Sequence, residues 1–348
     1  MSAVFARLFA SRLFWPIVML IILFLINVIA FPGFFSITVR DGNLYGSLVD
    51  ILRNGAPTLI IAVGMTLVIA TRGIDLSVGA VCAISGAVAC SILLGSPNPA
   101  DPGVVTVAIL TALVVGLVCG LWNGLLVALF GIQPIIATLI LMTAGRGVAM
   151  LITEGQILTV TSPPFKMLGS GFWLGIPVAV YLAAIVFVLA AVLTRRTALG
   201  LLIESVGINP EASRQAGVRS RGLLFAVYTF SALCAAVAGL ILTANTMAAD
   251  ANNAGLFIEL DAILAVVIGG TSLAGGRYSL AGTLVGALVI QTLVTTVYTV
   301  GIPPIVTMVF KAAVVTLVCL LQSQTTNDAL AGFRRRLALR AGKGVVTA

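Results

Sequence analysis

The chain has 348 residues, of which 60% are hydrophobic and only 9% are charged, and its formal net charge is +8. Soluble domains carry roughly 25% charged residues, so this composition excludes a soluble globular protein and indicates an integral membrane protein with many spans. The sequence contains no histidine, which excludes a histidine-based metal site and a histidine general base. The excess of basic residues is typical of membrane topology signals and does not indicate a nucleic-acid partner.

The cysteines do not suggest a disulfide framework or a metal site. All five lie in apolar segments and none forms a Cys-x-x-Cys pair: Cys82, Cys90, Cys119, Cys234 and Cys319. We interpret them as small packing residues. The sequence also lacks a Walker A motif, so we expect no cofactor in this chain and no ATP bound by it.

Apolar stretches of about 17–25 residues mark candidate transmembrane spans along the chain. They are 15–31, 56–71, 75–95, 104–130, 134–152, 176–194, 223–244, 259–270, 278–298 and 303–321. No cleavage site follows the first stretch, so we interpret it as a retained span rather than a signal peptide. The pattern predicts an all-α polytopic membrane protein of about ten transmembrane helices. Segment 259–270 is short, and 56–71 with 75–95 could form one re-entrant unit, which is typical of broken helices beside a binding site.

The distribution of basic residues predicts the orientation. With ten spans and a cytoplasmic N-terminus, fourteen Lys and Arg residues fall on the cytoplasmic side and three fall outside. This bias places both termini in the cytoplasm. We therefore expect one membrane domain over 1–348, with halves at 15–152 and 176–321, a cytoplasmic loop at 195–222 and a cytoplasmic tail at 322–348.

The loop 195–222 is the only substantial polar surface in the middle of the chain. It holds five arginines together with Glu204 and Glu211. A topology anchor would explain the arginines alone. The pattern around Asn209-Pro210 instead predicts a short helix, because asparagine is a preferred N-cap and proline a preferred first helical residue. We favour a helix that docks a soluble partner.

Two segments suggest an internal duplication. Residues 73–79 and 270–276 share the pattern Gly-x-x-Leu-small-x-Gly, and each follows a run rich in Ile and Val. Both interrupt a span in corresponding halves, as expected for repeats in a transporter. Separately, Gly116, Gly120 and Gly124 lie on one face of a predicted helix, and we expect tight helix packing within one subunit there.

Ionisable residues inside the spans need partners. Asp75 lies between two apolar runs, and it either caps the next helix or faces a water-filled cavity. Arg146 should pair with an acid or a carbonyl group, and Lys311 should pair with an acid across the bundle.

Several amide and acidic residues suit recognition of a polyol. Asn123 follows a tryptophan, and Gln133 lies just beyond the same span. Amides beside an indole match the hydroxyls and the apolar face of a sugar. The densest outer polar cluster contains Asp250, Asn252 and Asn253, which could bind hydroxyls, dock a soluble protein or simply form a solvated loop.

Three stretches resemble the permease subunits of the ribose/xylose/galactoside class of bacterial ABC importers. They are 64–79, 207–212 and 259–276, and the similarity extends over roughly residues 15–325. Within this class, the sequences around Trp122-Asn123-Gly124, Gln133, Arg146 and 249–256 look most like a galactofuranose-type permease.

The resemblance implies a helical import permease in the bacterial inner membrane that moves a monosaccharide into the cytoplasm. It implies four kinds of partner besides membrane lipid: a second permease subunit, identical or homologous, a cytoplasmic ATPase, a periplasmic sugar-binding protein and the sugar. The loop residues similar to the family's ATPase-coupling helix are Glu204, Gly207, Asn209, Glu211, Ala212 and Gly217. The chain departs from the family at Arg72, where a small residue, commonly glycine, is usual.

From these patterns we expect a permease rather than an enzyme. Candidates for the sugar pathway are Asp75, Ser77, Asn123, Gln133, Arg146 and Thr271, and candidates for periplasmic docking are Asp250, Asn252 and Asn253. The alternatives are a proton-coupled secondary sugar transporter and a polytopic enzyme that acts on lipid-linked sugars. The residues do not identify the sugar.

Overall fold

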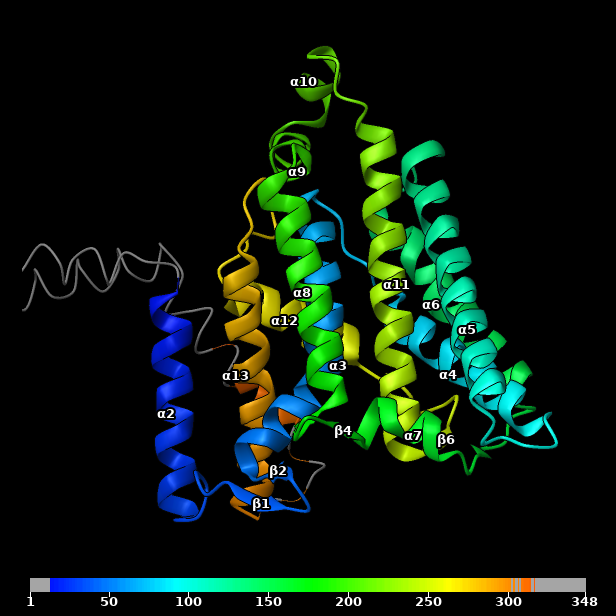
Figure 1. Ribbon diagram of the computed structural model, residues 1–348. Coiled ribbons are helices and arrows are strands. Elements are labelled where there is room, and N and C mark those ends of the chain that lie inside the picture. Colours follow the sequence, from blue (N-terminus) through cyan, green and yellow to red (C-terminus); the bar gives the residue numbers. More distant parts are fainter. Residues whose placement is uncertain (1–12, 302, 304–305, 307, 314–315, 317–348) are drawn as a thin grey trace, which may run out of the picture.

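The computed structural model is a bundle of helices, which confirms the all-α class (Figure 1). It describes residues 13–301 and, beyond them, 303, 306, 308–313 and 316. The main helices are α2 (Phe14–Ala30), α3 (Ser47–Ala70), α4 (Val78–Leu94), α5 (Pro102–Gly124), α6 (Pro134–Ile152), α8 (Val178–Arg196), α11 (Ser220–Thr246), α12 (Ile258–Ile268) and α13 (Leu280–Thr299). Shorter elements are the π-helix η1 (Leu125–Leu129), α7 (Pro163–Ser170), α9 (Leu199–Ile208) and α10 (Pro210–Gln215).

The strands are short and lie in connections between helices. β1 (Thr38–Arg40) pairs with β2 (Asn43–Tyr45), β3 (Leu158–Thr159) with β6 (Ala248–Ala249), and β4 (Phe172–Trp173) with β5 (Ile176–Pro177), all antiparallel. Figure 1 shows β1, β2, β4 and β6 at one end of the bundle and α10 at the opposite end. The two ends of the bundle therefore differ: one has paired connections, the other a protruding helical turn.

The described part of the chain has six helices that are long and apolar enough to cross a membrane. These are α3, α5 with η1, α6, α8, α11 and α13. The expectation of about ten is not supported, because α2 and α4 have only 17 residues each and α12 has 11. In segment 75–95, residues 75–77 are non-helical backbone that leads into α4, and segment 259–270 ends in non-helical backbone after α12. The last expected span, 303–321, and the expected tail, 322–348, lie largely or wholly outside the described residues.

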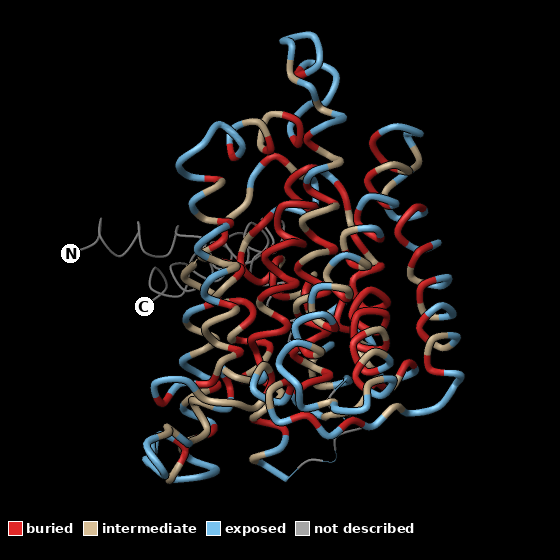
Figure 2. The backbone as a smooth tube through the Cα atoms, turned by 45° about the vertical axis from the view of Figure 1, so that its right-hand side comes forward, coloured by how far each residue is buried: buried red, intermediate tan, exposed pale blue. Residues whose placement is uncertain are grey.

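Two helices, α3 and α11, form the centre of the bundle. Both are largely buried by their neighbours, whereas few residues of α6 and α8 are fully buried (Figure 2). α11 packs against α3, α4 and α5. A helix that is apolar on all sides and also enclosed by protein is expected at the core of a polytopic bundle. The polar groups on α3 and α11 are consequently held away from lipid.

Close approach of α5 and α11 depends on Gly116, Gly120 and Gly124 of α5. A Cβ atom at Gly120 would lie 2.7 Å from the Cα of Thr229, and one at Gly124 would lie 2.8 Å from the ring of Phe225. Such distances are sterically forbidden, so the helices could not approach this closely with larger residues. The expectation of tight packing within one subunit is confirmed.

The short helices α4 and α12 begin side by side. A Cβ atom at Gly79, in the first turn of α4, would touch the carbonyl of Gly255 and the carboxylate of Glu259, in the first turn of α12. Figure 1 shows α12 at the middle height of the bundle. Non-helical backbone at this depth is tolerated only where protein or water surrounds it. The duplication proposed from the two Gly-x-x-Leu segments remains a prediction.

Candidate functional site

A buried polar network lies in the segment between α3 and α4. Asp75 accepts hydrogen bonds from the backbone N–H of Ser77 at 3.0 Å and from its hydroxyl at 2.6 Å. Its second carboxylate oxygen accepts from the Ser231 hydroxyl at 2.9 Å. The amide nitrogen of Asn123 donates to the Ser77 hydroxyl at 2.8 Å. All four side chains are fully buried, so the network links α4, α5 and α11 in the interior.

This geometry bears on the two interpretations of Asp75. Its carboxylate holds the N–H of Ser77, the residue that precedes α4, and so stabilises the entry to that helix. Ser77 holds the N-cap position of α4 and no side chain caps that helix, so Asp75 is not the predicted cap. Its two carboxylate oxygens accept from one backbone amide and two hydroxyls. Buried polar groups are expected to be paired in this way.

Two members of this region were not predicted from the sequence. Ser231 and Tyr228 lie three residues apart on α11, and the Tyr228 hydroxyl and the Asn123 carbonyl oxygen are buried without a hydrogen-bond partner. Polar residues at this spacing in an apolar span share one helix face. That spacing is the feature of the sequence from which the two residues could have been predicted. Serine and tyrosine are common in spans, however, so the spacing alone is a weak indication of a site.

The remaining pathway candidates do not join this network. Gln133 is exposed at the start of α6 and makes no side-chain cap. Thr271 is buried in the segment between α12 and α13, where its hydroxyl accepts from the backbone N–H of Ser279 at 3.2 Å. The structure thus unites Asp75, Ser77 and Asn123 but places Gln133, Thr271 and Arg146 elsewhere.

Arg146 of α6 binds the connection between α11 and α12. Its guanidinium donates to the carbonyls of Ala251 and Ala254 at 3.0 and 2.6 Å. The expectation that it pairs with an acid or a carbonyl is confirmed. Because those carbonyls belong to non-helical backbone, the arginine satisfies acceptors that would otherwise be unpaired at that depth.

The outer cluster forms a compact turn within this connection. Asp250 accepts from the backbone N–H groups of Asn252 and Asn253 and from the Asn253 side chain at 2.7 Å. The Asn253 side-chain bond is the main cause that lowers the pKa of Asp250 below its ordinary value. Asn252 and Asn253 are exposed, so their side-chain surfaces are accessible at this end of the bundle.

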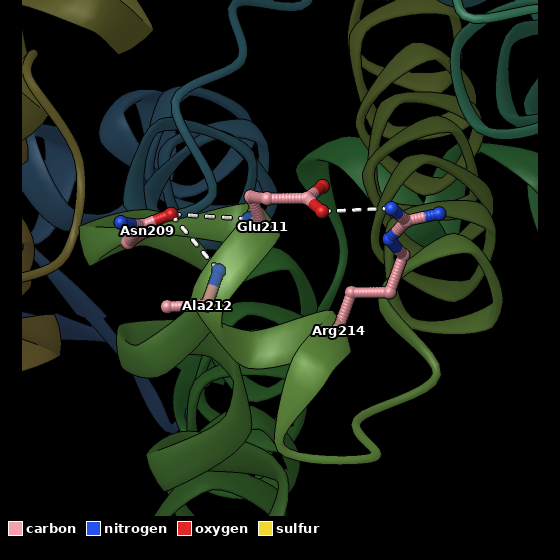
Figure 3. Close-up of polar contacts among 4 residues, drawn as sticks. All are labelled: Asn209, Glu211, Ala212 and Arg214. Carbon is pink, nitrogen blue, oxygen red and sulfur yellow. Dashed lines mark hydrogen bonds and ion pairs between the residues drawn. The ribbon is translucent and has the colours of Figure 1, made fainter.

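The predicted loop helix exists as two consecutive helices, α9 and α10. Asn209 ends α9 and begins α10, and its side-chain oxygen accepts from the backbone N–H groups of Glu211 and Ala212 at 3.1 Å each (Figure 3). Pro210 occupies the first position of α10. The predicted cap is confirmed, and it satisfies two of the amides that a helix start leaves unpaired.

The six loop candidates occupy different depths. Asn209, Glu211, Ala212 and Gly217 are exposed around the tip, where Glu211 also pairs with Arg214 at 2.7 Å (Figure 3). Glu204 is half-buried beside a surface pocket that Tyr278 also lines. Gly207 is buried against Ala70 and Gly276. The tip can therefore meet a partner, whereas Gly207 joins the tip to the bundle.

No cluster of three metal-binding side chains occurs among the residues that the structure describes. Comparison with known proteins decides the class. Residues 47–319 match the family described as branched-chain amino acid transport system / permease component.

The chain belongs to this family of transport permeases. This permease is 48% identical over 330 residues to the galactofuranose transporter permease protein YtfT of Escherichia coli, covering 93% of this chain and 95% of the relative. It is 44% identical over 348 residues to the fructose import permease protein FruF of Bifidobacterium longum, covering 98% and 96%. It is 38% identical over 312 residues to the ribose import permease protein RbsC of E. coli, covering 88% and 92%. No solved structure matches it.

The family is one of membrane transporters and not of enzymes, so this permease is a multi-pass membrane protein that carries solutes. The enzyme alternative is therefore set aside. The name of the family refers to amino acids, whereas the three relatives named above are described as sugar permeases.

Proposed function

We propose that this permease is the membrane subunit of an ATP-driven importer for a monosaccharide. The three relatives, each matched over most of its length, are described as permeases for galactofuranose, fructose and ribose, and galactofuranose belongs to the most similar of the three. The geometric observation that carries the proposal is the α9–α10 tip, a capped helix exposed at the end of a membrane bundle. Such a tip suits a soluble ATPase, since it is polar and projects beyond the bundle (Figure 1).

We place the permease in the bacterial inner membrane with both termini in the cytoplasm, following the distribution of basic residues. In this orientation the α9–α10 tip is cytoplasmic and faces the ATPase, while Asp250, Asn252 and Asn253 face the periplasm. There they would meet a sugar-binding protein. A second permease subunit would complete the assembly.

We assign the sugar pathway to the region of Asp75, Ser77 and Asn123. In the described conformation these groups hydrogen-bond one another. A sugar hydroxyl can replace such a bond only if α4 and α5 separate, so access must alternate with closure. The buried, protein-satisfied state would then be the closed state, in which no polar group faces hydrocarbon.

The test is uptake into vesicles that contain the permease, its ATPase and its binding protein. We expect labelled galactofuranose, fructose or ribose to accumulate only with ATP and binding protein present. A proton gradient alone should drive no uptake. Uptake driven by the gradient in vesicles that lack the ATPase would instead favour the secondary transporter.

A further inference from the structure

An unusual residue, Arg72, follows the C-terminal end of α3, which faces the cytoplasm in the proposed orientation. The N–H of Gly73 bonds the carbonyl of Val68 and the N–H of Arg72 bonds that of Ile69, both at 3.0 Å. These two bonds define a Schellman motif, in which the residue at the position of Arg72 is left-handed and usually glycine. Arg72 has φ +66° and therefore adopts a backbone conformation that disfavours a side chain.

The side chain of Arg72 has a specific partner that glycine could not have. Its guanidinium donates to the carbonyl of Ile208, the last residue of α9. The final carbonyls of a helix lack partners within the helix and carry partial negative charge. Arg72 thus caps α9 from α3, directly before the Asn209 that begins α10.

The connection between α12 and α13 also contacts the C-terminal end of α3. The N–H of Gly276, between α12 and α13, donates to the carbonyl of Ala70 at 2.9 Å. A Cβ atom at Gly207 would lie 2.9 Å from the Cα of Gly276 and would also collide with the Ala70 carbonyl. Residues 70–73, 207–208 and 275–276 therefore interlock without space for a larger side chain.

This junction joins the α9–α10 tip to both Gly-x-x-Leu segments. The 73–79 segment leads into α4 and the buried network, and the 270–276 segment leads into α13. Backbone groups and glycines form most of the contacts, so the three segments cannot slide past one another without breaking hydrogen bonds. Arg72 contributes a hydrogen bond among them that depends on a long side chain.

We propose that Arg72 is a positioning residue that transmits displacement of the α9–α10 tip to α3 and to the α12–α13 connection. The inference rests on the proposed function, in which an ATPase moves that tip. When the tip is drawn outward, the Ile208 carbonyl carries the guanidinium and the end of α3 with it. The Gly276 N–H, bonded to Ala70, extends the same movement to the second segment.

The test separates this role from a role in folding. Arg72→Gly removes the guanidinium while it relieves the left-handed backbone, so the purified variant should melt at or above the wild-type temperature. Its ATPase should co-purify normally, because the tip is intact. The sugar transported per ATP hydrolysed should fall roughly tenfold, the effect expected when a charged hydrogen bond that matters in one state is lost.

Three comparisons complete the experiment. Arg72→Ala keeps the left-handed backbone strain and loses the contact with Ile208. It should lose as much coupling as Arg72→Gly and should also melt at a lower temperature than the wild type. Arg72→Lys keeps a cationic donor and should recover part of the coupling. Arg40→Ala removes an exposed arginine of β1, at the opposite end of the bundle, and should leave coupling unchanged.

Two results would overturn the inference. One is Arg72→Gly with wild-type sugar-to-ATP stoichiometry, and the other is loss of coupling that Arg72→Lys does not restore at all. Absence of ATP-dependent uptake in the wild-type complex would instead refute the proposed function, and the two failures are therefore distinguishable.

Discussion

The ammonium group of Lys311 donates to both carboxylate oxygens of Asp261, at 2.8 and 2.7 Å, across 50 positions of sequence. Asp261 lies in the first turn of α12, and the expectation that Lys311 pairs with an acid across the bundle is confirmed. An ionised group in the membrane interior is costly unless it is paired. Each residue thus neutralises the other where α12 begins.

We predict that Lys311→Met destabilises the permease more than the loss of both charges does. Breaking a fully buried pair costs about 3–5 kcal/mol, but side-chain exposures of 18% and 23% should reduce the loss to about 1–3 kcal/mol. The measurement is the melting temperature in detergent. The double variant Asp261→Asn/Lys311→Met should recover most of the loss, and Lys166→Met, at an exposed lysine of α7, should have little effect. A double variant no better than the single one would contradict the pairing.

The buried network supports a second prediction, with a matched control. Ser77→Ala removes a hydroxyl that donates to Asp75 and accepts from Asn123. The buried Asn123 amide nitrogen then loses its acceptor, while Asp75 keeps its bonds from the Ser77 N–H and the Ser231 hydroxyl. We expect a stability loss of about 1–3 kcal/mol and several-fold lower uptake per inserted permease. Ser85→Ala removes a buried hydroxyl of α4, bonded to the carbonyls of Cys82 and Ala236, and should lower stability without lowering uptake per inserted permease. Equal normalised uptake in the two variants would show that the network only supports packing.

The third prediction concerns the cap of α10. Asn209→Ala removes the acceptor for the N–H groups of Glu211 and Ala212, a change that costs about 0.5–2 kcal/mol at a helix start. We expect weaker co-purification of the ATPase and lower uptake, with normal insertion into the membrane. Asn209→Asp should restore both, since aspartate caps equally well, and Gln215→Ala on the same helix serves as control. If the ATPase binds Asn209→Ala as it binds the wild type, the tip is not its docking element.

The fourth prediction tests the orientation with single cysteines. Asn252→Cys and Gln215→Cys, at exposed positions near opposite ends of the bundle, are introduced after removal of the native cysteines. An impermeant thiol reagent applied to intact spheroplasts should label position 252 at once. It should reach position 215 only after the membrane is opened. The reverse pattern would invert the proposed topology. Ala251 is a poor site for such labelling because it is buried.

Much of the helical layout follows from apolar length and from local signals. The stretch 134–152 predicts α6, and Asn209-Pro210 predicts the start of α10, because both depend on residues close in sequence. The glycine spacing of α5 correctly predicts close helix packing. The depth at which a helix begins in the bundle is harder to predict. A run of apolar residues looks the same whether its helix crosses the whole membrane or begins midway, as α12 does.

The site was only partly predictable for a related reason. Asp75 and Ser77 are neighbours in the chain, but Ser231 reaches Asp75 across 156 positions, and one apolar helix does not show which face meets which neighbour. Arg72 illustrates the same limit. The sequence marks it as a departure from the family, whereas its left-handed backbone and its bond to Ile208 emerge only from the fold.

The small size of α10 has a consequence for how the tip recognises a partner. Six residues are far fewer than the dozen or so that an isolated helix needs to persist in water. The helix is therefore stabilised by the Asn209 cap and, in the proposed complex, by the surface of the ATPase that covers the exposed turn. Amide protons at 211–216 should therefore exchange rapidly in the free permease and slow markedly once the ATPase is bound, so that the extent of docking could be followed by mass spectrometry without any change to the sequence.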